Sequence, residues 1–166
     1  MTITLKPEVL TAERFAPFGD VIEAALDHKA GMNAGRFDRF DGLGRVDTKG
    51  GKASISIARC RIATALPYRI DMVERHTLGS QAFVPLSKGR MIVVVAEPGE
   101  SVEASDLRAF VTNGRQGVNY HRGTWHMPLI AFEEGQEFLV VDRATDQPNC
   151  DEHTLGETVM LVGDDE

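Results

Sequence analysis

The sequence predicts a mainly β fold, a barrel or sandwich of short strands with a few short helices. At least seven segments after residue 53 either alternate apolar and polar residues or form short apolar runs, as strands do. Turn-forming residues separate these segments, and 16 glycines and 7 prolines favour short elements over long helices. At 166 residues the chain has room for one domain with a substantial core, so we expect a single domain over residues 1–166.

The N-terminal part is predicted to be irregular. Thr11 can cap a single helical turn that Pro17 and Gly19 end, and a short strand follows over residues 21–23. Residues 27–51 are the least periodic stretch, with six glycines among many charged residues. A structureless segment of that length is uncommon in a compact domain. We expect either a functional loop (a lid or a dimer contact) or a surface loop that contains short strands.

The rest of the chain is predicted to be β almost throughout. The run over residues 91–96 is wholly apolar, and a short helix or turn is expected over residues 104–110. The acidic tail, residues 163–166, is expected to be frayed. The predicted strands cover residues 54–58, 70–76, 81–86, 91–96, 118–121, 125–132 and 138–141.

Composition excludes several classes of function. The chain has 18 basic and 25 acidic residues, a net charge of -7, and only 7% aromatic residues, so nucleic acid is an unfavourable partner. No apolar run approaches the roughly 20 residues that span a bilayer, and the first residues lack the apolar region of a signal peptide. Cys60 and Cys150 are expected to be reduced thiols. A cytoplasmic protein without membrane contact is therefore expected.

Polar groups lie at the ends of two apolar stripes. Residues i and i+2 of a strand share a face, so Glu74 and His76 continue the face that begins with Ile70. Gln81 begins the next strand and can face them, and His126 lies at the end of another apolar stripe. Nitrogen and oxygen donors of this kind suit zinc, nickel, manganese or iron, and they suit acid–base catalysis without a metal equally well.

Two segments resemble the two cupin motifs: His76-x4-Gln81-x7-Gly89 and His121-x-Gly123-x2-His126. The usual cupin ligands are two histidines, a glutamate and a final histidine. Here Glu74 stands at the first histidine position and Gln81 at the glutamate position. The resemblance implies a cupin-like β-barrel of the jelly-roll type, with a metal site formed by Glu74, His76, Gln81 and His126.

Longer strings resemble the ureidoglycolate lyases of allantoin degradation. They are ERHTLGSQAFVP (residues 74–85), RAFVTNG (108–114) and GVNYHRGTWHMPL (117–129), and further matches run in the same order over most of the chain. The resemblance implies a cytoplasmic homodimer that splits (S)-ureidoglycolate into glyoxylate and urea. It also implies Ni²⁺ or another divalent metal as cofactor.

Cleavage of this substrate needs two proton transfers. The substrate carbon carries a hydroxyl, a carboxylate and the urea nitrogen, so a base must take the hydroxyl proton and an acid must protonate the departing nitrogen. We expect Glu74 or His126 to be the base, and His76 or His121 to be the acid.

The substrate carboxylate should meet an arginine. Arg39 in the Gly-rich loop and Arg122 beside the histidine turn are the candidates, and Gln81 is a further substrate-binding candidate. Neighbours on a strand point to opposite sides. The site therefore contains either Tyr120 with Arg122 or Asn119 with His121, and the sequence does not choose.

Three other functions compete with the lyase. They are a ureidoglycolate hydrolase that releases ammonia, a non-catalytic cupin that binds small carboxylic acids, and a metal-dependent dioxygenase. Cys150 has no sequence partner for nucleophilic catalysis, and no Gly-rich phosphate loop is present. Asp142 and Arg143, at a strand end, are interpreted as an ion pair.

Overall fold

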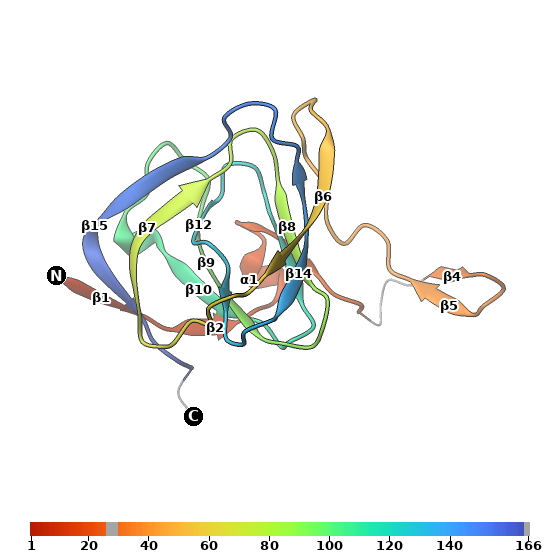
Figure 1. Ribbon diagram of the computed structural model, residues 1–166, viewed down its shortest axis with the longest axis horizontal. Helices are drawn as coiled ribbons and strands as arrows, with labels where there is room; N and C mark the ends of the chain where they lie inside the picture. Colours follow the sequence, from red (N-terminus) through yellow and green to blue (C-terminus); the bar gives the residue numbers. More distant parts are fainter. Residues whose placement is uncertain (26–29, 165–166) are drawn as a thin grey trace.

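The computed structural model describes residues 1–25 and 30–164, which form two facing β-sheets and a separate hairpin (Figure 1). In this described part the only helices are α1 (Ala12–Phe15) and the 3-10 helix η1 (Ala104–Asp106). The strands are β1 (Thr2–Leu5), β2 (Pro7–Val9), β3 (Gly19–Ile22), β4 (Ala30–Met32), β5 (Phe37–Arg39), β6 (Ala53–Arg59), β7 (Tyr68–Arg75), β8 (Gln81–Pro85), β9 (Met91–Ala96), β10 (Arg108–Val111), β11 (Gly117–Tyr120), β12 (Trp125–His126), β13 (Ile130–Ala131), β14 (Glu137–Arg143) and β15 (Asp151–Leu161).

The two sheets form the walls of a nearly closed barrel. The larger sheet has the order β1-β15-β7-β12-β9-β10-β2, with β13 also paired to β9, and the smaller has the order β3-β11-β8-β14-β6. In Figure 1, β15 and β7 form one side of the barrel, and β8, β14 and β6 form the other. This arrangement confirms the predicted mainly β, cupin-like fold of the jelly-roll type with a few short helices.

Strand β9 is buried on both faces, which explains its wholly apolar sequence. Val93 and Val95 belong to the core between the two sheets, which also holds Phe15, Phe110 and Phe138. The alternate residues, Ile92, Val94 and Ala96, belong to a second core on the other side of the larger sheet, with Val73, Trp125, Leu155 and Leu161. The barrel therefore has two apolar cores with β9 between them.

Most predicted elements are confirmed, with two differences. The hydroxyl of Thr11 accepts a hydrogen bond from the Arg14 backbone N–H at 3.2 Å, so the predicted cap is present. The predicted helix over 104–110 ends at Asp106, and β10 follows it. The predicted strand over 125–132 is divided into β12 and β13, because Pro128 lies between them and has no N–H for the sheet.

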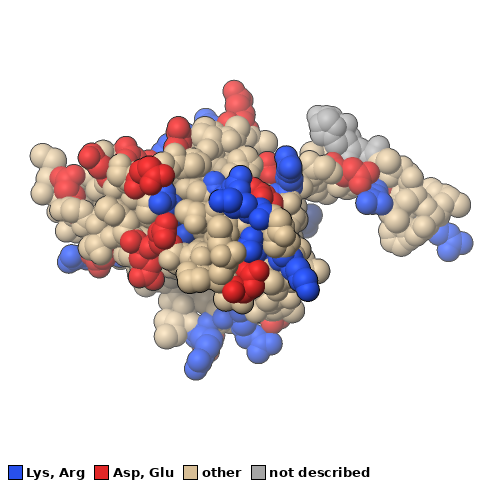
Figure 2. Space-filling model, turned by 90° about the horizontal axis from the view of Figure 1, so that it is seen from above, with Lys and Arg blue, Asp and Glu red and all other residues tan. Residues whose placement is uncertain are grey.

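Several elements were not predicted. The longest strand, β15, was missed because its exposed polar residues and a register shift between Thr154 and Val159 hide the alternation. Strands β1 and β2 were also missed. Within the predicted loop 27–51, β4 and β5 form a hairpin that projects from the barrel (Figures 1 and 2). Residues 27–29 of that loop, and residues 165–166 of the predicted tail, lie outside the described part.

Candidate active site

Glu74 and His126 are direct neighbours across two antiparallel strands. Glu74 lies on β7 and His126 on β12, and the two residues are paired in register. His76 follows Glu74 by two positions, just after β7 ends, so its side chain returns to the same face. The predicted convergence of these three residues is therefore produced by strand periodicity and one strand pairing.

The three side chains meet at a buried point. Oε1 of Glu74 lies 3.5 Å from Nε2 of His126 and 4.0 Å from Nε2 of His76. One ligand atom from each residue lies within 4.8 Å of the other two. His126 is only 2% exposed, and Glu74 and His76 are partly buried. This cluster is called the Glu–His–His cluster below.

The contacts of the two Nδ1 atoms show which nitrogen of each imidazole carries the proton. Nδ1 of His76 lies 2.7 Å from the backbone oxygen of Asn149. Nδ1 of His126 lies 3.0 Å from the backbone oxygen of Thr124. A carbonyl oxygen only accepts hydrogen bonds, so each Nδ1 carries its proton. Each Nε2 then presents a lone pair toward Glu74 when the ring is neutral.

These lone pairs require a positive charge in the cluster. Within the described residues both Nε2 atoms are buried and have no hydrogen-bond partner. Two lone pairs and a carboxylate that face one another repel in a site with little water. A divalent cation or additional protons on the rings would remove that repulsion. Two imidazole nitrogens, each oriented by a backbone carbonyl, and a carboxylate are a donor set that fits a divalent metal.

Glu74 is held in its ionised form. When His126 is protonated on Nε2, its hydrogen bond and its positive charge lower the pKa of the Glu74 carboxyl, against the opposing effect of burial. Its other oxygen, Oε2, accepts a hydrogen bond from the Cys150 thiol at 3.5 Å. Burial and the negative charge of Glu74 raise the pKa of Cys150 to about 11, so this thiol stays protonated and is a poor nucleophile.

Tyr120, and not Asn119, faces the inside of the barrel, but Arg122 does not join it there: Arg122 pairs with Asp47. The Tyr120 ring stacks on His126 with centroids 4.4 Å apart and an interplanar angle of 12°. Burial, together with the nearby charge of Glu74, raises the pKa of Tyr120. Tyr120 therefore stays protonated, next to the Glu–His–His cluster.

Tyr120, Gln81 and Asp142 form one row across the smaller sheet. Tyr120 on β11 pairs with Gln81 on β8, and Gln81 pairs with Asp142 on β14. Residues paired in this way share a face of the sheet, so all three face the inside of the barrel. Nε2 of Gln81 donates a hydrogen bond to Oδ2 of Asp142 at 3.1 Å. The role of Gln81 as a metal ligand stays a prediction.

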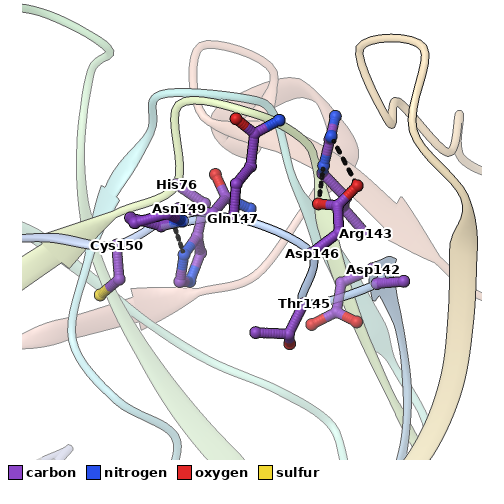
Figure 3. Close-up of a pocket in the computed structure, with 10 residues that line it drawn as sticks. His76, Asp142, Arg143, Thr145, Asp146, Gln147, Asn149 and Cys150 are labelled. Atoms are coloured by element: carbon purple, nitrogen blue, oxygen red, sulfur yellow. Dashed lines mark hydrogen bonds and ion pairs between the residues drawn. The ribbon is translucent and has the colours of Figure 1, made fainter.

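A cavity of about 450 Å³ adjoins His76 and Asp142. Residues 144–150, between β14 and β15, form most of its lining (Figure 3). The predicted pair of Asp142 and Arg143 is not formed: Arg143 pairs with Asp146 at 3.2 Å, because neighbours on β14 point to opposite faces.

The other predicted site residues lie elsewhere. Asn119 is on the outer face of the smaller sheet and donates to Asp20 at 2.9 Å. His121 also contacts Asp20, at 3.1 Å. Arg122 pairs with Asp47 at 3.3 Å, and it lines a second cavity of about 390 Å³ together with His121. Arg39 is exposed on β5, where it pairs with Asp41.

Comparison with known proteins gives the family of the chain. Residues 2–162 match the family model described as ureidoglycolate lyase. The chain belongs to the ureidoglycolate lyase family. A ureidoglycolate lyase of Pseudomonas syringae pv. syringae (strain B728a) is 51% identical over 159 residues, which are 95% of this chain and 93% of that protein. Ureidoglycolate lyases of Pseudomonas entomophila (strain L48) and Pseudomonas aeruginosa (strain LESB58) are 48% and 49% identical, and each alignment covers at least 96% of both chains.

Sequence reasoning missed three residues of the site in this member of the ureidoglycolate lyase family. Asn149 and Cys150 approach the Glu–His–His cluster from the segment before β15, far away in sequence, and no periodicity links them to it. Asp142 could have been found, because it continues the inward alternation of Phe138 and Val140 on β14.

No helix in the described ranges is long and apolar enough to cross a membrane.

Proposed function

We propose that the protein is a ureidoglycolate lyase that cleaves (S)-ureidoglycolate to glyoxylate and urea. The observation that carries this proposal is the Glu–His–His cluster beside a cavity, in a chain that belongs to the ureidoglycolate lyase family. The reaction breaks one carbon–nitrogen bond and consumes no water. It needs proton transfer at two atoms of the substrate and neutralisation of an anion.

Glu74 is the proposed base. It is ionised at neutral pH, and the cluster keeps its carboxylate in one place. Removal of the hydroxyl proton by this carboxylate would allow the carbon–oxygen double bond of glyoxylate to form as the carbon–nitrogen bond breaks. The alternative base, His126, is held with its Nδ1 proton toward Thr124.

His76 is the proposed acid. It lines the cavity, and in the metal-free cluster its doubly protonated ring would deliver the Nε2 proton to the departing urea nitrogen. With Nε2 bound to a metal ion, His76 would be a ligand instead and would have no proton to give from that atom. The alternative acid, His121, contacts Asp20 on the outside of the smaller sheet. Gln81 and Tyr120, which face the inside of the barrel, are proposed contacts of the substrate. Arg122, Arg39 and Asn119 lie away from the cluster, and their contact with the substrate carboxylate stays a prediction.

A divalent metal, nickel or another ion, is part of the proposal. Glu74, His76 and His126 would hold it, with Gln81 as the further proposed ligand from the adjacent row. When bound, such an ion supplies positive charge that stabilises the alkoxide and orients the carboxylate. Tyr120, stacked on His126, would keep that imidazole in place and exclude water from one side of it.

We also propose that the protein is a cytoplasmic homodimer with a single domain. Both cysteines are free thiols, which is usual in a reducing compartment.

On the edge strand β6, Ile55 and Ile57 are 74% and 60% exposed, and the hairpin projects beyond it. An apolar edge strand of this kind favours pairing with a second copy. Ile57→Lys should then give a monomer in light scattering, whereas Val9→Lys, at a 65% exposed position on β2, should not.

Product analysis tests the reaction directly. Purified protein is incubated with ureidoglycolate before chelation, after exhaustive chelation and after addition of nickel. We expect equal amounts of glyoxylate and urea, formed faster than in the spontaneous reaction. This activity should be lost on chelation and recovered when nickel is added. Ammonia in place of urea would identify the hydrolase. No acceleration under any of the three conditions would leave a binding protein and contradict the proposal.

A further inference from the structure

The inside of the barrel carries polar groups on both of its walls. The larger sheet contributes Glu74 and His126, and the smaller sheet contributes the row Tyr120, Gln81 and Asp142. The stacking of Tyr120 on His126 joins one end of this row to the Glu–His–His cluster. Asp142 lies at the other end, two strand spacings or about 10 Å away along the sheet. A small molecule bound at the cluster can therefore extend toward Asp142.

The Asp142 carboxylate is oriented and has an oxygen available. Its Oδ2 accepts from the Gln81 amide at 3.1 Å. Its Oδ1 has no hydrogen-bond or ion-pair partner within residues 1–25 and 30–164, and the neighbouring Arg143 pairs with Asp146 instead. Asp142 and His76 line the same cavity, and Figure 3 shows both among its lining side chains. The free oxygen is thus a hydrogen-bond acceptor that borders the cavity beside the cluster.

The Glu–His–His cluster and Asp142, at the two ends of this arrangement, attract different chemical groups. The Glu–His–His cluster with a cation attracts a carboxylate and an alkoxide, whereas Asp142 repels them. An ionised carboxylate accepts hydrogen bonds from N–H groups, and a ureido group offers several N–H donors and no charge. We propose that Asp142 binds the ureido N–H groups of the substrate and thereby selects ureido acids over simple 2-hydroxy acids. This inference rests on the proposed function and adds the residue that sets its specificity.

Binding of two unreactive analogues tests the proposal. N-carbamoylglycine carries the carboxylate and the ureido group but lacks the hydroxyl, whereas glycolate carries the carboxylate and the hydroxyl but no ureido group. Their dissociation constants are measured by calorimetry for the nickel-loaded protein and for Asp142→Asn, Asp142→Ala and Glu137→Gln. Glu137 is a matched control, because it lies on the same strand and pairs with Arg59 at the surface.

We expect both Asp142 variants to bind N-carbamoylglycine at least about tenfold more weakly and glycolate within twofold of the unsubstituted protein. Glu137→Gln should bind both analogues normally. Equal weakening for the two analogues would show that Asp142 only supports the structure, and no weakening would show that it does not touch the ureido group; both results would overturn the proposal. A failure of the proposed function is seen separately, as an absence of urea formation by the unsubstituted protein.

Discussion

Asn149 holds the imidazole of His76 from the segment that lines the cavity. Its backbone oxygen lies 2.7 Å from Nδ1 of His76, and its side-chain oxygen accepts a hydrogen bond from the backbone N–H of Leu78 at 2.6 Å. The first contact fixes the ring proton, and the second fixes the position of Asn149 relative to the turn after His76. The orientation of the His76 ring therefore depends on a residue more than seventy positions away.

Asn149→Ala should weaken this support without removing a group that touches the substrate. We expect nickel affinity and kcat to fall by about tenfold, the lower end of the range for residues that orient metal ligands. Asn149→Asp retains an acceptor for the Leu78 N–H, so its nickel affinity and its kcat should be closer to those of the unsubstituted protein. Calorimetric nickel titration measures the affinity. Normal nickel binding by the alanine variant would show that the Asn149 side chain is not needed to hold its backbone oxygen against His76.

Glu74→Gln removes the proposed base while the shape of the side chain is retained. Turnover of ureidoglycolate should fall by about 10²-fold or more, the contribution typical of a positioned acid or base. Asp71→Asn is the matched control on β7, because Asp71 faces away from the cluster and pairs with Arg69 at the surface. Steady-state rates of urea release compare the two variants. A loss below about threefold in folded Glu74→Gln would remove Glu74 from the mechanism.

His76→Ala and His121→Ala distinguish the two proposed acids. His76 lines the cavity, whereas His121 contacts Asp20 outside the barrel. We expect a loss of about 10²-fold for His76→Ala and less than threefold for His121→Ala, measured as kcat for urea release. The opposite pattern would move the reaction to the second cavity, which His121 and Arg122 line.

The sequence was sufficient to predict that Glu74 and His76 lie together at the centre of the candidate site, because their spacing is local. Glu74 and His76 share a face through strand periodicity, and the apolar stripe before each polar group predicted that it faces the core. Contacts between distant segments could not be predicted in this way. Asn149 and Cys150 are brought to the cluster by the register of β15 on β7, which depends on the tertiary fold.

The same limit applies to the fold. The wholly apolar β9 was predicted with its exact bounds, whereas β15 was missed, because only some of its residues are buried and a bulge interrupts its period. Tyr120 and Asn119 could not be assigned to faces by alternation alone. The stacking of Tyr120 on His126 and the contact of Asn119 with Asp20 decide the matter.

Acid should weaken the structure around Asp20. Burial opposes ionisation of this carboxyl, but hydrogen bonds from Asn119 and His121 outweigh it and hold the pKa of Asp20 below its ordinary value of 3.8. Because the folded pKa is the lower one, the stabilisation is present above about pH 4 and is lost as the pH falls through the folded value.

Asp20→Asn tests this dependence. At pH 7 we expect the variant to have a free energy of unfolding about 1 kcal/mol below that of the unsubstituted protein. The difference in free energy of unfolding between the two proteins should decrease as the pH falls below 3.8. Urea unfolding curves at a series of pH values measure this difference. A difference that does not change with pH would mean that ionisation of Asp20 makes no contribution to stability.

The position of β9 between the two cores also bears on how the protein unfolds. Neither core can open without exposing one face of this strand, so loss of either should cost nearly the whole free energy of unfolding. Backbone amides of Val93 to Val95 should then exchange with solvent deuterium only through global opening. His126 pairs directly with Val95. His126 of the candidate site is thereby attached to the strand that we expect to exchange most slowly, whereas the exposed hairpin should exchange fast.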